Sequence, residues 1–155
     1  MPWSGLKSRF KTFLAPSIRD RVDFHVTGYR HAYDQRGKGW ITIDGKILIA
    51  FCDFVYENAL RIESEANGKG PWNADAFAAV KARQILPDHS LGEAMEQVMN
   101  HPVATSLRSD NPLVVALAAL DRRTGKRRLA AIELQALPEW SRSLITLRLE
   151  AERVR

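Results

Sequence analysis

The segment GWITIDGKILIAFC, residues 39–52, decides the fold. It consists of two runs rich in β-branched and apolar residues, which favour extended strands. Between the runs stands the dipeptide Asp44-Gly45, a strong signal for a two-residue hairpin turn. The segment therefore predicts two antiparallel strands joined by a tight turn.

A third strand is predicted on the N-terminal side of this hairpin. Val22, Phe24 and Val26 alternate with polar residues, and this period of two is typical of a strand with one buried face. The glycines of QRGKG, residues 35–39, interrupt the pattern before the hairpin begins. Together these segments predict a three-stranded antiparallel meander.

Helical periodicity dominates the remainder of the chain. Apolar residues spaced by three and four predict a first helix that begins after a Ser4 cap and ends before Pro16. Further helices are predicted over residues 56–67, 74–86, 91–99, 112–120, 129–137 and 140–154. The predicted fold class is α+β, a single globular domain of residues 1–155 with an N-terminal helix, the meander, and four to five helices packed on one face of the sheet.

Several residues mark where these helices begin and end. Asn73 is a candidate cap for one helix, and Ser90 with Glu93 matches a capping box before another. Ser109 or Asp110 is expected to cap the helix with Pro112 in its first turn, and that helix is apolar all round, which predicts a central position in the core. The GKGPW segment, residues 68–72, is the best candidate for a loop or lid.

Composition and charge narrow the possible functions. The chain has 155 residues, 45% of them hydrophobic, one cysteine and no export-signal pattern, and no apolar run approaches the roughly 20 residues that span a bilayer. We therefore expect a soluble, cytoplasmic protein. The formal charge is +5 over residues 1–40, −4 over 41–100 and +4 over 101–155, so the surface is either dipolar or neutralised by internal pairing.

Motifs of common enzyme classes are absent from the sequence. There is no G-x-S-x-G nucleophile elbow and no phosphate-binding loop. His25 and His31 lie six residues apart on one strand face, roughly 20 Å, too far to ligate one metal ion, and His89 and His101 also lack ligand spacing. We therefore expect no metal and no cofactor, although folding could still assemble an acid–base pair.

Two groups of residues are candidates for binding. The first is a set of strand residues that could stack on bases and hold phosphates, or could pack under helices as ordinary strand residues: His25, Tyr29, Arg30, His31, Tyr33 and Trp40. The second is a basic cluster that could pair with internal acids, be solvated, or bind an anionic partner: Arg122, Arg123, Lys126, Arg127 and Arg128.

Several strings also resemble a known family: Trp3-Ser4, Leu6-Lys7 and Arg9, then HVTGYRHAYD (25–34), GWITIDGK (39–46) and SDNPLVVALAALDRRTGKRRL (109–129). They resemble a family of small bacterial conserved hypothetical proteins of unknown function, which implies a bacterial cytosolic protein and no catalytic residues. We therefore expect a non-catalytic interaction protein, of an immunity-like or regulatory kind, that binds another protein. Nucleic-acid binding and an unrecognised enzyme are the alternatives, and the oligomeric state stays open.

Overall fold

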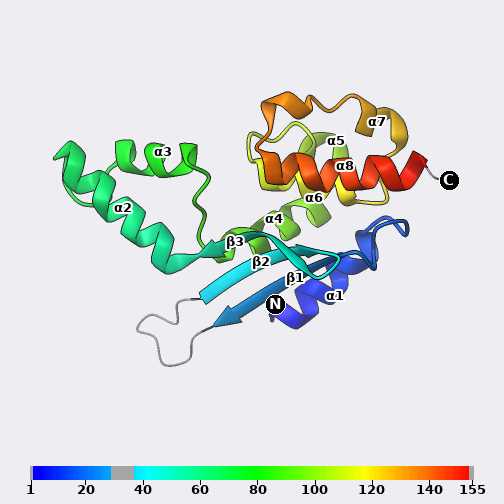
Figure 1. The fold of residues 1–155 in the computed structure, drawn as a ribbon, viewed down its shortest axis with the longest axis horizontal. Helices are drawn as coiled ribbons and strands as arrows, with labels where there is room; N and C mark the ends of the chain where they lie inside the picture. The colour runs from blue at the N-terminus through cyan, green and yellow to red at the C-terminus, as the bar shows by residue number, and fades with distance from the viewer. Residues whose placement is uncertain (1, 29–36, 154–155) are drawn as a thin grey trace.

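The computed structural model describes residues 2–28 and 37–153. Its elements, in chain order, are α1 (Trp3–Phe13), β1 (Val22–Gly28), β2 (Gly37–Ile43), β3 (Lys46–Cys52), α2 (Asp53–Asn67), α3 (Ala74–Ala82), α4 (His89–Asn100), α5 (Val103–Ser106), α6 (Pro112–Leu120), α7 (Lys126–Ala130), η2 (Leu134–Ala136) and α8 (Glu139–Arg153). The predicted α+β fold is confirmed (Figure 1). Among the described residues, no helix is both long and apolar enough to cross a bilayer.

The sheet is an antiparallel meander in the order β1-β2-β3, as predicted. Asp44 and Gly45 join β2 to β3 with backbone φ angles of 51° and 81°. Two successive residues with positive φ are the geometry of a tight two-residue hairpin turn. His25 pairs with Trp40, so these β1 and β2 residues lie side by side on one face of the sheet. Phe24 and Ile41 point to the opposite, fully buried face.

Helices lie behind the buried face of the sheet in successive layers. The ring of Phe10 in α1 meets that of Phe24 edge to face, with centroids 5.4 Å apart. α4 contacts both α1 and β2, α6 packs on α4, and α8 packs on α6. α6 is the centre of this core, because every residue from Leu113 to Leu120 is buried, as its uniformly apolar sequence predicted.

The end of α6 is held by a buried arginine. Arg148 in α8 is 4% exposed, and its guanidinium donates hydrogen bonds to the carbonyl oxygens of Ala119, Asp121 and Thr124. These carbonyls lie in the last turn of α6 and just after it, where a helix leaves acceptors without partners. Arg148 therefore joins α8 to the C-terminal end of α6.

Several local predictions differ from the structure. The helix predicted over residues 129–137 is instead α7, which starts at Lys126, followed by a turn and η2, because Ile132, Leu134 and Leu137 face a second apolar cluster with Leu129. α1 begins after Pro2 rather than at a Ser4 cap. α6 is capped by Asn111, whose side chain accepts a bond from the Leu113 N–H.

The capping box predicted at Ser90 does not form. α4 begins two residues earlier than predicted, at His89, after Asp88. The N–H of Asp88 donates to Asp53 Oδ1 at 2.8 Å. The backbone N–H at the start of α4 is thus bonded to a side chain 35 residues away in the sequence. The local sequence around α4 gives no signal for this long-range cap.

Candidate functional site

α2 and α3 form an antiparallel hairpin that extends away from the other helices (Figure 1). We call residues 53–82 the arm. Its two helices are held together by a small apolar cluster of their own, separate from the main core: Ala59, Leu60, Ala76 and Val80. The contacts of α2 outside the arm are mainly with β3. The arm therefore depends largely on its own packing.

The loop at the tip of the arm, residues 68–72, is tightly organised. Gly68 ends α2 with a φ of 67°, and Asn73 caps α3 by accepting a bond from the Ala76 N–H at 2.9 Å. Trp72 has a φ of 55°, which is unfavourable for a bulky residue. Its N–H donates to Ser64 Oγ at 3.2 Å, and its indole is half exposed. The loop thus holds a large aromatic side chain at the surface despite backbone strain.

Large apolar side chains are exposed along the arm. Of six such residues in the described part of the chain, five belong to the arm: Phe54, Val55, Ile62, Trp72 and Phe77. The sixth, Ile47, lies in β3. Val55 and Ile62 are seven residues apart, so they share one face of α2 two turns apart. Several large apolar side chains exposed on one part of a domain are typical of an interaction site.

Two hollows flank this apolar surface. One, of about 730 Å³, lies along α2 and the tip loop and is lined by Phe54, Arg61 and Trp72. The other, of about 1060 Å³, separates α3 from the helical body and is lined by Phe77, Leu86 and residues 109–112 and 136–138. The ring centroids of Trp72 and Phe77 are 6.5 Å apart. The arm therefore presents aromatic side chains toward two concave surfaces.

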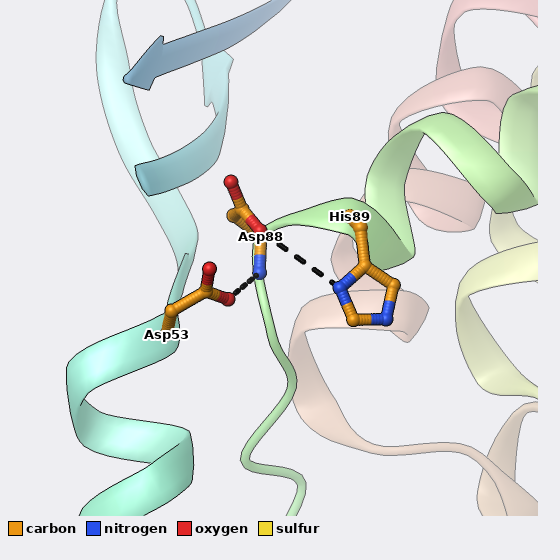
Figure 2. Close-up of side chains that lie close together, drawn as sticks. All are labelled: Asp53, Asp88 and His89. Carbon is orange, nitrogen blue, oxygen red and sulfur yellow. Dashed lines mark hydrogen bonds and ion pairs between the residues drawn. The ribbon is translucent and has the colours of Figure 1, made fainter. Parts of the chain in front are cut away.

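Three metal-ligating side chains meet at the base of the arm. Asp53 begins α2, and Asp88 and His89 stand at the start of α4 (Figure 2). One ligand atom from each lies within 4.8 Å of the other two. Burial and the neighbouring Asp53 carboxylate raise the pKa of Asp88. This cluster lies where the chain leaves the body for the arm and where it returns.

The basic cluster splits into a structural residue and exposed cations. Arg123 is paired with the fully buried Asp121 through Nε and Nη2, at 3.1 and 2.7 Å, and its guanidinium lies 4.8 Å from the centre of the Phe13 ring. The hydrogen bonds that Arg123 donates to Asp121 raise the pKa of Arg123. The other four members are exposed and form no ion pair with any acidic residue in the described ranges: Arg122, Lys126, Arg127 and Arg128.

The strand-face candidates are only partly described. His25 stacks on Trp40, with ring centroids 5.0 Å apart, and Lys38 Nζ lies 5.7 Å from the Trp40 ring centre. Both aromatic side chains are half-buried. The remaining candidates, Tyr29, Arg30, His31 and Tyr33, lie outside the described residues. The open face of the sheet thus carries one stacked aromatic pair beside a lysine.

Residues 2–149 match the SF0329 protein family. The chain belongs to the SF0329 protein family. This agrees with the resemblance seen in the sequence, because the family's description states no activity. No curated protein and no solved structure matches this SF0329 family member.

The arm surface was missed at the sequence level, although a signal for it existed. Apolar residues of α2 occur at positions 54, 55, 56, 59, 60 and 62. A helix with one buried face needs a single apolar stripe, and positions 56, 59 and 60 already supply it. Val55 and Ile62 lie outside that stripe, and this excess is the pattern expected for a second contact surface.

Proposed function

We propose that this SF0329 family member is a non-catalytic interaction protein of the bacterial cytosol that binds a protein partner through the arm. The observation that carries the proposal is the exposure of Val55, Ile62, Trp72 and Phe77 on a hairpin, where no other described part of the chain covers them. Interfaces are enriched in aromatic and apolar side chains at their centres. Trp72, held in place by a strained loop, is suited to the role of an anchor.

The charge of α2 indicates the chemistry of the partner. α2 contains four carboxylates and one arginine, a net charge of −3. By helical spacing Glu63 and Glu65 flank the face that carries Val55 and Ile62, so they favour a partner with an apolar helix or groove bordered by lysine and arginine. The hollow between Phe54 and Trp72 provides room for one of its side chains.

Site-specific photocrosslinking in cells tests the proposal. A photoreactive phenylalanine at position 55 should form an adduct with one protein species, because Val55 is 54% exposed and is not part of the arm's own cluster. The matched control places the same residue at position 47, since Ile47 is equally apolar and 60% exposed but lies in β3. Adducts at both positions, or at neither, would contradict the proposal. An adduct of twice the chain mass would identify the partner as a second copy.

Nucleic-acid binding is a second candidate, favoured by the four exposed cations of the basic cluster. Because Arg127 and Arg128 have no acidic partner among the described residues, they remain available to phosphates. This function predicts an affinity that falls steeply with salt and is lost in Arg127→Ala plus Arg128→Ala. Binding that is insensitive to salt, or retained by the double variant, would exclude it.

A further inference from the structure

We propose that Asp53, Asp88 and His89 bind a divalent transition-metal ion at the base of the arm. Their ligand atoms already lie within 4.8 Å of one another (Figure 2). Around a six-coordinate ion with bonds of about 2.1 Å, cis ligands lie roughly 3.0 Å apart and trans ligands roughly 4.2 Å apart, so the three side chains have to rotate toward one another to bind one ion. The three residues come from two segments that α2 and α3 separate in sequence.

The cluster has an unbalanced negative charge that a cation would relieve. Asp53 and Asp88 are close enough that the Asp53 carboxylate contributes to a raised pKa of Asp88, after burial. Among the described residues no lysine or arginine pairs with either carboxylate, and the nearest base is His89, whose Nδ1 lies 3.9 Å from Asp88 Oδ1. Two adjacent carboxylates without a cation repel each other, and a dication removes that repulsion.

The positions of the ligands are fixed by the surrounding structure. Asp53 Oδ1 accepts the Asp88 N–H at 2.8 Å, which aligns the two carboxylate-bearing residues. Gly37 in β2 leaves space for Asp88, because a Cβ at that position would lie 2.5 Å from Asp88 Oδ2. His89 Nε2 lies 3.9 Å from Glu93 Oε1, so a carboxylate is available to orient the imidazole from its far side.

The ligand set selects the class of ion. Two carboxylates with one imidazole suit Zn²⁺ or Mn²⁺ better than Mg²⁺ or Ca²⁺, which prefer oxygen ligands alone. His89 is exposed and borders the 1060 Å³ hollow, so water can complete the coordination. An ion here would fasten the first residue of α2 to the start of α4 and so restrict movement of the arm. Sequence spacing gave no sign of this site, because folding brings Asp53 to within reach of residues 88 and 89.

Calorimetric titration of the chelator-treated protein with ZnCl₂ and with MnCl₂ tests the inference without any partner protein. Wild type should bind one ion, and Asp53→Asn and His89→Ala should each weaken binding by at least about 10-fold. Asp53→Asn keeps a hydrogen-bond acceptor for the Asp88 N–H, and His89 is exposed, so circular dichroism should show both variants folded. His101→Ala is the matched control, because this exposed histidine follows the far end of α4 and hydrogen-bonds there to Gln97 O.

Hydrogen exchange supplies an independent readout of the same site. Zn²⁺ should slow amide exchange in the first turn of α2 in wild type and in His101→Ala, but not in His89→Ala. Absence of one-site binding by wild type for both ions would overturn the inference. Equal loss of binding in His101→Ala and His89→Ala would overturn it as well.

Discussion

Replacing Leu60 by alanine should unfold the arm while the main core stays folded. Leu60 is 1% exposed, and it shares its buried cluster with Val80 and two alanines, against which the partly buried Tyr56 and Ile85 pack. Full burial of a leucine or valine contributes about 1.5–3 kcal/mol, so Leu60 supplies a large share of the arm's apolar stabilisation. A Leu→Ala change at such a site costs about 2–5 kcal/mol. The remaining apolar burial should then no longer offset the conformational entropy that the arm loses on folding.

Hydrogen exchange followed by mass spectrometry resolves this effect. In Leu60→Ala, amides of residues 56–82 should exchange much faster than in wild type, whereas those of α6 should keep their protection, because the arm opens as a separate unit. Leu117→Ala is the control, since Leu117 is fully buried in the main core and its loss should lower the melting temperature by on the order of 10 °C. If Leu60→Ala lowered the melting temperature equally and left exchange in the arm unchanged, the separate packing of the arm would be refuted.

Two further predictions concern the body of the protein. Burial alone would raise the pKa of Asp23, but hydrogen bonds from Lys11 and Lys7 lower it to about 2, so Asp23 stabilises the fold above pH 4 and loses this effect as the pH falls through 2. Because the Asp23 side chain is 37% exposed, Asp23→Asn should lower the free energy of unfolding in urea by only about 1 kcal/mol at pH 7. The loss should be much smaller at pH 2, and an equal loss at both pH values would contradict the stabilising role of the ion pairs. Arg148→Met should lower the free energy of unfolding by about 3–5 kcal/mol, because three buried carbonyls lose their donor. The control is Arg142→Met, since Arg142 is half-buried on the same helix. Similar losses of stability in both variants would exclude a special role for Arg148.

The sheet was predictable because its signals are local. Asp44-Gly45 demands two left-handed residues in succession, and the structure has both. The alternation through Val22 and Phe24 placed these side chains on the buried face correctly. α6 was equally predictable, since a helix that is apolar on every side has to be surrounded by other elements.

Elements whose boundaries depend on distant partners were not predictable. The start of α4 is set by Asp53, and the segment after α7 turns so that Ile132 and Leu134 can face α8 and α6 residues of the second apolar cluster. The pairing of the basic cluster was also open at the sequence level, where acids of residues 53–96, solvent or an anionic partner were the alternatives. In the described part of the chain, Arg123 pairs with Asp121, two positions away.

The arm surface was hidden for a different reason. Periodicity shows which residues of a helix are apolar, but it does not show how many neighbours the helix will find. α2 meets α3 on one side and little else, so Val55 and Ile62 stay exposed although they are as apolar as core residues.

The affinity of the arm for its partner tests the central claim most directly. Val55 and Ile62 are about half exposed, so covering each in a complex is worth roughly 1 kcal/mol, half of a full burial. The variant Val55→Ala plus Ile62→Ala should therefore bind the crosslinked partner about 30-fold more weakly. Its own stability should change little, because alanine is the better helix former. Ile47→Ala should bind like wild type, and full affinity in the double variant would contradict the assignment of the arm as the binding surface.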